Sequence, residues 1–235
     1  MTLEIDVLTL FPSWFSWLVE ERHVSNALAG PLTLRLHNIR DHSEHRHRMV
    51  DDTPYGGGAG MLLRVDVAVA AIEGALGADL DEVRRTRRVV VLDPGGRRLD
   101  DAYARELAAG PPIVLLCGRY EGFDHRVHTH VATESLSIGP YVVAGVEMAA
   151  MVVIDAVVRH LDGALGATDS AEHESFSPAL EGRIEHPHYT RPPSFRGWDV
   201  PEVLLSGDHG AVDRWRIAES ERRTEEAAGD PDSLS

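Results

Sequence analysis

The amino-acid sequence predicts an α/β protein built on a parallel sheet, followed by a smaller domain that is mainly helical. Two observations lead to this prediction. Strand-like and helix-like segments alternate through the first two thirds of the chain, and residues 87–117 form a strand–helix–strand pattern. In that pattern two short apolar runs, 87–93 and 112–117, flank a helical segment that Asp100 would cap and Gly110 would end.

The segments before this unit alternate in the same way. Residues 3–11 are rich in β-branched and apolar types and predict a strand, and residues 13–29 predict a helix that Ser13 would cap. Residues 32–40 alternate strictly between apolar and polar types, as a half-buried strand does. Residues 64–77 place apolar side chains on one helical stripe.

The remainder of the chain divides at a polar segment. A last apolar helix over 147–161 ends the first predicted domain, residues 1–161. Residues 162–177 are small, polar and acidic without an apolar period, which indicates a mobile linker. A second, mainly helical domain is expected over residues 178–226, and residues 227–235 have the composition of a frayed tail.

Composition excludes several classes of protein. The formal charge is -15 and all 23 basic side chains are arginine, which argues against a non-specific polyanion binder with a broad basic face. No run approaches the roughly 18 apolar residues needed to span a bilayer. The single cysteine, Cys117, excludes an intramolecular disulfide and a cysteine-based zinc site. We therefore expect a soluble, cytoplasmic protein that does not bind membranes.

Four glycine-rich loops are the candidate functional segments, at residues 55–61, 93–98, 117–124 and 137–147. The last three follow or join strand-like runs, and the carboxyl ends of parallel strands are where α/β sheets bind ligands. Taken singly, each loop could be a plain turn. No GxGxxG opens a helix after a strand, and the phosphate loop of nucleotide-binding folds requires a lysine that this chain lacks.

Five segments carry a recognisable family pattern. They are VDDTPYGGGAGM (50–61), CGRYEG (117–122) with DHRV just after it, SIGPYVVAG (137–145), SAEHESF (170–176) and HYTRPPSFRGWDVPEVLLSGDHGAVDRW (188–215). In this order and at this spacing they resemble the bacterial tRNA (guanine-N1)-methyltransferases of the SPOUT class. The resemblance extends from about residue 3 to residue 224.

The resemblance implies a fold, a cofactor and partners. It implies a SPOUT-type parallel sheet with a deep C-terminal trefoil knot, which binds S-adenosyl-L-methionine in a bent shape. It also implies a homodimer with the active site at the interface, closed over a tRNA by the linker and C-terminal domain. The methyl acceptor would be N1 of the guanine just 3′ of the anticodon. Magnesium assists the reaction in the family resembled, and we expect no fixed protein site for it.

The same resemblance assigns candidate site residues. The cofactor set comes from three of the loops: Leu92, Asp93, Pro94, Gly95, Gly118, Arg119, Tyr120, Glu121, Ile138, Gly139, Pro140, Tyr141, Val142, Val143 and Gly145. The substrate set is Asp52, Tyr55, Gly56, Gly57, Gly58 and Arg191. The catalytic pair is Glu174 and Arg159.

The chemistry of guanine explains why such a pair is needed. Guanine N1 carries a proton and is a poor nucleophile, so a base must remove that proton during methyl transfer. Negative charge then develops mainly on O6 and requires a fixed cationic donor. The resemblance makes Glu174 the base and Arg159 the donor. Without it, Glu174 would be an ordinary solvated acid, and Arg159 a cation at a helix C-terminus.

Four positions depart from the usual family pattern. Glu174 stands where aspartate is normal, Pro140 where aspartate is common, Val146 where glycine is normal and Asp93 where a hydroxyl residue is common. These changes surround the predicted cofactor and base. They leave open a paralogue that N-methylates a small heteroaromatic compound of indole or purine type, and a catalytically inactive RNA-binding module.

Two smaller signals also have competing interpretations. His42, His45 and His47 lie close together with Glu44, but they lack the spacing on a regular element that fixes metal geometry, so no metal site is predicted. In the C-terminal domain arginines alternate with aromatic residues, which suits stacking and phosphate contacts on RNA. The alternative is that two of these aromatics, Trp198 and Trp215, form the core of that domain.

Overall fold

The computed structural model describes residues 2–165 and 174–229. These two stretches belong to two compact units. Residues 166–173 of the predicted linker lie outside the described residues, as does the end of the predicted tail. Within the described ranges, no helix has the length and apolar character needed to cross a membrane.

The first unit contains a sheet of five strands whose neighbours are all parallel. The order across the sheet is β2 (Leu32–Asn38), β1 (Leu3–Thr9), β6 (Ile113–Leu116), β5 (Arg88–Arg98) and β7 (Glu134–Ser137). The predicted α/β class with a parallel sheet is thus confirmed. Because the strands are parallel, the loops that follow them meet at one edge of the sheet.

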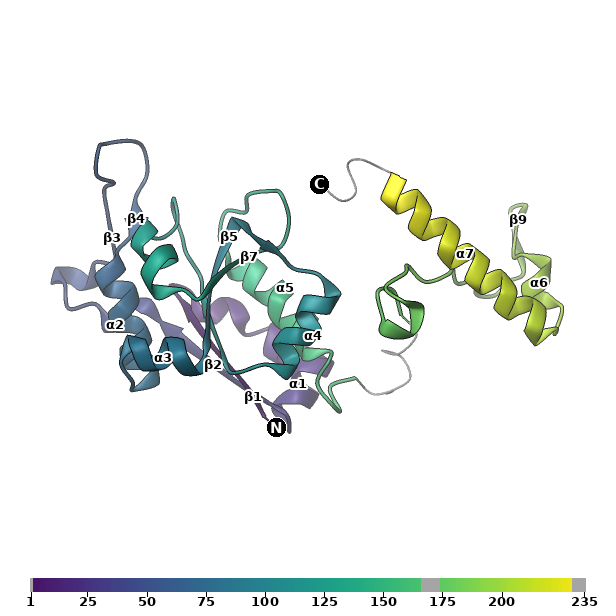
Figure 1. Cartoon of the computed structure of the whole chain (residues 1–235), viewed down its shortest axis with the longest axis horizontal. Coiled ribbons are helices and arrows are strands. Elements are labelled where there is room, and N and C mark those ends of the chain that lie inside the picture. Colours follow the sequence, from purple (N-terminus) through teal and green to yellow (C-terminus); the bar gives the residue numbers. More distant parts are fainter. Residues whose placement is uncertain (1, 166–173, 230–235) are drawn as a thin grey trace. The chain divides into compact units, whose positions relative to one another are not determined.

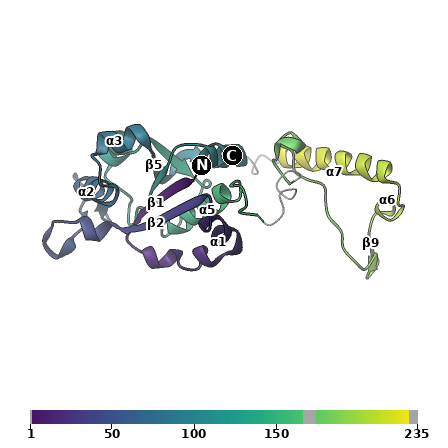
Figure 2. The same ribbon diagram turned by 90° about the horizontal axis from the view of Figure 1, so that it is seen from below.

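Helices cover both faces of this sheet (Figures 1 and 2). On one face lie α2 (Val65–Leu76) and α3 (Leu80–Thr86), and their apolar residues share a buried cluster with alternate strand residues. On the other face α1 (Arg22–Leu28), α4 (Asp101–Ala109) and α5 (Glu147–Val158) form the second cluster. The sheet therefore separates two apolar cores.

The strand–helix–strand prediction for residues 87–117 is confirmed. β5 and β6 are parallel neighbours, and α4 connects them. The Asp100 carboxylate accepts the Tyr103 backbone N–H at 2.7 Å, and Gly110 follows the last helical residue as the C-cap. The sequence therefore predicted both ends of α4 correctly, the N-cap at Asp100 and the end at Gly110.

The continuous helix expected over residues 13–29 is wrong. Two 3-10 turns, Pro12–Phe15 and Leu18–Glu20, precede the short helix α1. Phe15 and Leu18 lie three residues apart and are both buried, and a 3-10 geometry brings residues at that spacing onto one face. Burial of these two side chains therefore decides the local structure of the segment.

Short elements complete the first unit. The antiparallel pair β3 (Asp51–Asp52) and β4 (Leu62–Leu63) brackets the first glycine-rich loop. Further 3-10 turns span Ile39–His42 and Arg46–Arg48, and a π-helical turn spans Val127–Val131. These pieces hold connecting loops in place without adding to the sheet.

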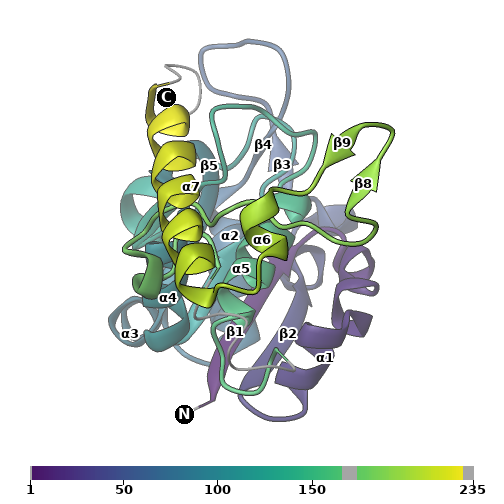
Figure 3. The ribbon, with the colours of Figure 1, turned by 90° about the vertical axis from the view of Figure 1, so that its right-hand side faces the viewer.

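The second unit is a long helix with smaller pieces beside it (Figure 3). α7 (His209–Gly229) is preceded by α6 (Glu202–Leu205), a hairpin of β8 (Ser194–Phe195) and β9 (Trp198–Asp199), and a 3-10 turn, Pro178–Leu180. Trp198 is 69% exposed, so a core role for it is wrong. The half-buried Trp215 contacts the rings of His186 and Tyr189.

Candidate functional site

A pocket opens beside the middle of β5 and at the ends of β6 and β7, and three segments form its wall. They are the segments 91–94, 118–123 and 136–146. Most of the predicted cofactor set lines it: Leu92, Asp93, Pro94, Gly118, Arg119, Tyr120, Glu121, Ile138, Gly139, Tyr141, Val142, Val143 and Gly145. Gly95 and Pro140 belong to the same loops but do not line the pocket.

The first loop is a bulge inside β5. Pairing with β7 shifts register between Leu92 and Arg97, and the four intervening residues arch away from the ladder. The Asp93 carboxylate accepts the Gly95 backbone N–H at 2.7 Å. A Cβ on Gly96 would lie 2.5 Å from the Leu136 nitrogen, so only glycine lets the bulged strand rejoin its neighbour.

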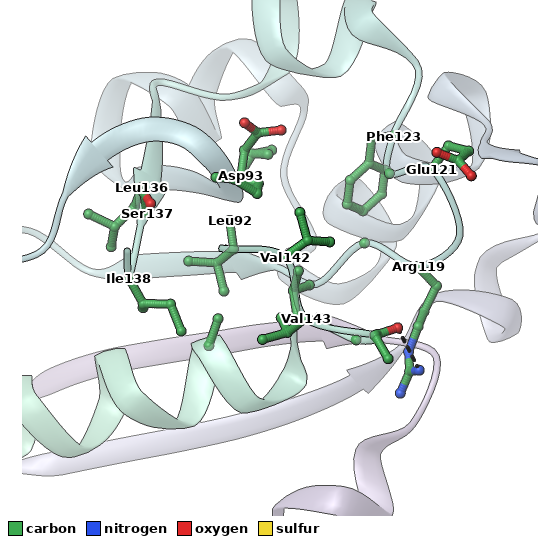
Figure 4. A pocket seen from close by; sticks show the side chains of 18 of the residues that line it. Leu92, Asp93, Arg119, Glu121, Phe123, Leu136, Ser137, Ile138, Val142 and Val143 are labelled. Carbon is green, nitrogen blue, oxygen red and sulfur yellow. Dashed lines mark hydrogen bonds between the residues drawn. The ribbon is translucent and has the colours of Figure 1, made fainter. Parts of the chain in front are cut away.

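The pocket interior is mainly apolar with charged side chains at its rim (Figure 4). The carboxylates of Asp93 and Glu121 lie apart, and Glu121 is on the side of the pocket where Phe123 lies. The buried Ser137 hydroxyl is 3.1 Å from both the backbone nitrogen and the carbonyl oxygen of Gly139 and holds the third loop in shape. Such a pocket suits a ligand with a flat apolar part and a positively charged part.

The loop that carries most of the predicted substrate residues is attached to this pocket. Backbone hydrogen bonds join Leu63 N–H to the Gly122 carbonyl at 2.9 Å and Glu121 N–H to the Met61 carbonyl at 3.1 Å. A Cβ on Gly60 would lie 2.5 Å from Cγ of Glu121. The structure therefore brings the 53–61 loop beside the Glu121 loop, although the two are far apart in the sequence.

Within that loop the predicted substrate residues are accessible. Tyr55 is 100% exposed, and Gly56, Gly57 and Gly58 all have positive φ. Asp52 accepts a hydrogen bond from Nη1 of Arg64 at 2.9 Å. The three glycines adopt conformations that other residues rarely take, which explains why this run of the sequence contains them.

Arg119 is held by a buried acid. Its Nη2 lies 3.0 Å from Oε2 of Glu147, whose side chain is fully buried at the first position of α5. Cys117 lies next to this pair and is fully buried in the core. Burial, together with the negative charge of Glu147, raises the pKa of the Cys117 thiol well above its ordinary value. A buried thiol of that kind is unreactive.

Comparisons with known proteins connect this site to a family. A family model described as tRNA (Guanine-1)-methyltransferase TrmD matches residues 3–231. The chain belongs to this family. A tRNA (guanine-N(1)-)-methyltransferase of Dehalococcoides mccartyi is 52% identical over 94% of this chain and 87% of its own length. A relative with the same description in Sorangium cellulosum is 50% identical over 94% of this chain and 90% of its own length. One in Brevibacillus brevis is 46% identical over 99% of this chain and 91% of its own length.

The resemblance inferred from sequence motifs is thus confirmed, and the TrmD family pattern can be placed on the structure. Arg159 is the C-cap of α5 in the first unit, where it follows the last helical turn. Glu174 and Arg191 belong to the second unit. Arg159 does not line the pocket of its own unit.

Glu174 begins a compact turn that rests on α7. The Phe176 N–H donates to the Arg183 carbonyl at 2.8 Å, and the Ser177 N–H donates to the Glu174 carbonyl at 3.1 Å. The far end of the turn is tied to the long helix, because Ile184 N–H donates to the Thr224 hydroxyl at 3.0 Å. The segment that presents Glu174 is therefore ordered by α7.

Several pocket residues were not predicted from the TrmD pattern. They are Val91, Gly122, Phe123, His128, Leu136, Ser137, Ala144, Val146 and Ala149. Most flank predicted residues, so the strand ends themselves were the available signal. His128 is half-buried and lines the pocket from the π-helical turn. No sequence period indicates such a turn.

The Val146 departure is accommodated without strain. Its φ of -78° lies in the ordinary helical region, so a branched side chain is allowed there. Val146 packs partly buried against the core while lining the pocket. Val146 therefore adds apolar contacts at a position where glycine, the usual family residue, would let the backbone approach more closely.

The histidine cluster forms a separate hollow. His42, Glu44, His45 and Asp66 line it, and Nε2 of His45 lies 2.8 Å from Oδ2 of Asp66. A hydrogen bond from Arg64 lowers the pKa of Asp66 far below its ordinary value. Among the described residues, no three His, Cys, Asp or Glu side chains are grouped to hold a metal ion.

Proposed function

We propose that this protein transfers a methyl group from S-adenosyl-L-methionine to N1 of the guanine just 3′ of the anticodon in tRNA. The observation that carries the proposal is the TrmD family match over residues 3–231, combined with a pocket built by the loops of that family pattern. Residues 1–161 would be the catalytic domain, 162–177 the linker and 178–226 the C-terminal domain. Such an enzyme would act with its tRNA in the cytoplasm.

The pocket residues fit the cofactor. Leu92, Leu136 and Ile138 offer an apolar wall for the adenine ring, and glycines in the loops leave backbone groups accessible. Glu121 at the rim provides negative charge for a cationic ligand. When bound in this pocket, the cofactor would supply an electrophilic methyl group on sulfur, with a neutral thioether as the leaving group. We further propose that the second and third pocket loops form the trefoil knot of SPOUT enzymes.

The chain's own residues would handle the proton and the charge. The Glu174 carboxylate accepts the N1 proton of guanine, and the electron pair of that N–H bond becomes available for the new N–C bond. The Arg159 guanidinium donates hydrogen bonds to O6, where negative charge develops. Because these residues lie in different units, the proposal requires the units to meet around the substrate.

Single-turnover methyl transfer tests the proposed base. Glu174→Gln keeps the shape but cannot accept the proton, so we expect the rate to fall by roughly 100-fold or more. Glu174→Asp restores the usual family residue and should retain most of the rate. Glu181→Gln, in the same turn, serves as the control and should be normal. Near-normal turnover of Glu174→Gln would show that another group is the base.

A second copy of the chain is the proposed partner of an exposed apolar face in the first unit. Phe11, Trp14 and Trp17 are exposed beside α5, whose Met148 and Val152 are also exposed. The last two lie four residues apart and so share one side of the helix. Exposed aromatic residues are enriched in the centres of interfaces. Sedimentation equilibrium should give a dimer, and Trp14→Glu should shift it toward the monomer.

The second unit presents a surface suited to the proposed tRNA contact. Phe195 and Trp198 are exposed, with ring centroids 5.9 Å apart, and the Arg196 guanidinium stacks 5.2 Å from the Phe195 ring. Aromatic and arginine faces of this kind stack on unpaired bases. Arg191 lies in the segment before this hairpin and is exposed. Replacing it with glutamine should reduce the salt dependence of tRNA binding by about one phosphate contact.

Methyl transfer from labelled cofactor to unfractionated tRNA, with nucleoside analysis, tests the proposed activity. We expect 1-methylguanosine as the product. Parallel reactions with and without magnesium would measure whether the ion assists the transfer. Cofactor binding without this product would point back to the small heteroaromatic acceptor, which the comparisons do not favour. Absence of both cofactor binding and product would leave the RNA-binding module.

A further inference from the structure

Glu147 is a fully buried carboxylate that the family pattern does not assign to the pocket. It is the first residue of α5, directly after Val146, and its side chain is 0% exposed. Carboxylates are rarely buried completely unless they are paired. The groups that pair with it therefore indicate what it does.

Among the described residues, Thr9 and Arg119, from distant parts of the chain, contact the Glu147 carboxylate. The Thr9 hydroxyl, at the end of β1 and also fully buried, donates to Oε1 at 2.9 Å. Arg119 places Nη2 3.0 Å from Oε2 and Nε 3.3 Å from Oε1. The carboxylate is thus fixed from one side by the sheet and holds the guanidinium on the other.

Arg119 in turn joins the two pocket loops that contribute most to the wall. It belongs to the 118–123 loop, and its Nη1 donates to the Ala144 carbonyl at 3.3 Å in the 136–146 loop (Figure 4). A Cβ on Gly145 would lie 2.4 Å from the Arg119 Cζ, so the guanidinium passes through space that only glycine leaves open. The side chain therefore acts as a crossbar between the loops.

The outer face of the guanidinium is covered by aromatic rings. Its Cζ lies 4.6 Å from the ring centroid of Phe11 and 4.7 Å from that of Trp14. Cation–π contacts at these distances are attractive. Arg119 is consequently held in one orientation by Glu147, by Ala144 and by the segment that follows β1.

Stability alone does not explain why a buried ion pair stands here. Desolvation of two charges often cancels their attraction, and well-packed apolar residues of similar volume can replace such a pair without loss of stability. Position at the N-terminus of α5 favours an acid, but only by a small amount. The distinctive property of this pair is the geometry that it imposes on the two loops.

We propose that Glu147 is a positioning residue that acts through Arg119 to hold the 118–123 and 136–146 loops in the geometry that binds the cofactor. This inference rests on the proposed function, because it takes the ligand of the pocket to be S-adenosyl-L-methionine. Thr9 supports the same role by fixing the carboxylate on β1. None of the three needs to touch the reacting atoms.

The first test measures cofactor affinity by calorimetry in the full chain. Glu147→Gln loses the charge that orients Arg119, and we expect the Kd for S-adenosyl-L-methionine to rise about tenfold or more. The KM for cofactor should rise in parallel while kcat at saturation changes less. Thr9→Ser retains the hydroxyl, so its Kd for the cofactor should be almost normal. Thr9→Val loses the hydroxyl, and its Kd should lie between those of the wild type and Glu147→Gln.

The deciding variant separates positioning from stability. The double variant Arg119→Met with Glu147→Leu replaces the ion pair by apolar side chains. The melting temperature of this double variant should therefore be close to that of the wild type. If the pair positions the loops, this double variant still binds cofactor about tenfold or more weakly. Wild-type affinity in the stable double variant would overturn the inference and leave the pair a structural one.

An independent variant covers the case in which Glu147→Gln does not fold. Gly145→Ala keeps every charge but displaces the guanidinium, and it should also weaken cofactor binding. Gly30→Ala, whose added methyl meets nothing within 4 Å, is the control. Normal affinity in Gly145→Ala would count against the proposal. If the wild type itself bound no S-adenosyl-L-methionine, the proposed function would fail, and this inference with it.

Discussion

Two buried carboxylates in the first unit have opposite relations to the pocket. Asp6, in the middle of β1, and Glu147, at the start of α5, are both fully buried and both paired with arginine. Glu147 and its arginine stand in or beside the pocket wall. Among the described residues, neither Asp6 nor its partners Arg35, His37 and Arg87 line the pocket. Equal burial therefore need not mean an equal role.

The partners of the two acids differ as well. Asp6 accepts from Arg35 Nε at 2.8 Å, from Arg87 Nη1 at 3.1 Å, and lies 2.8 Å from His37 Nε2. Arg35 is 41% exposed, so this cluster reaches solvent. Asp6 connects the start of β5 with β1 and β2, whereas Glu147 connects loops. We expect the Asp6 cluster to control stability and the Glu147 pair to control binding.

Removing the Asp6 charge should have the largest effect on stability. Asp6→Asn removes the buried partner of Arg35 and Arg87, which then keep only the partly exposed Glu4, and breaking a buried pair costs about 3 kcal/mol of unfolding free energy. The Kd for cofactor should stay within about twofold of wild type. Urea denaturation and calorimetry measure the two quantities.

The control for that variant removes an exposed ion pair. Asp66→Asn removes the charge that pairs with Arg64 and His45, and exposed pairs contribute at most about 1 kcal/mol each. If Asp6→Asn cost no more than Asp66→Asn, burial of Asp6 would be energetically irrelevant. If it weakened cofactor binding as strongly as Glu147→Gln, the comparison between the two acids would break down.

Acid should reveal the Asp6 cluster selectively. Burial alone would raise the pKa of Asp6, but hydrogen bonds from Arg35 and His37 outweigh it and lower the pKa below its ordinary value of 3.8. A lowered folded pKa contributes stability above the unfolded pKa, and that contribution is lost as pH falls through the folded value. The stability difference between wild type and Asp6→Asn should therefore be constant near neutrality and shrink below about pH 4.

Urea midpoints of the two proteins between pH 7 and pH 3 measure this difference. Other carboxylates with lowered pKa, such as Glu106 and Asp124, are present in both proteins and largely cancel. Curves that remain parallel through this range would mean that Asp6 titrates normally in the folded protein.

The smallest expected effect concerns packing beside Glu147 without any change of charge. Val146→Gly restores the usual family residue but removes a partly buried side chain next to the core, which should lower the unfolding free energy by about 1 kcal/mol. Cofactor affinity should change by less than about twofold. A tenfold change would mean that Val146, and not the Arg119–Glu147 pair, shapes this part of the pocket.

Local signals predicted much of this fold correctly. The strand–helix–strand unit carried its cap at Asp100 and its stop at Gly110, and both act over a few residues. The 13–29 helix failed because burial of Phe15 and Leu18 against distant elements decides that segment. The π-helical turn that brings His128 to the pocket has no sequence signature of its own.

The candidate site likewise has features that local sequence signals predict and features that depend on long-range contacts. The sequence by itself determined the family, the parallel sheet and the loops that follow its strands, since glycines, caps and apolar runs act locally and recur in relatives. Only the tertiary structure decided that Gly60 packs on Glu121 and that Arg119 crosses to Ala144 while Thr9 holds Glu147. These contacts join residues up to 138 positions apart, and no spacing rule encodes them. They follow from the parallel sheet, which brings the ends of separate strands to one edge.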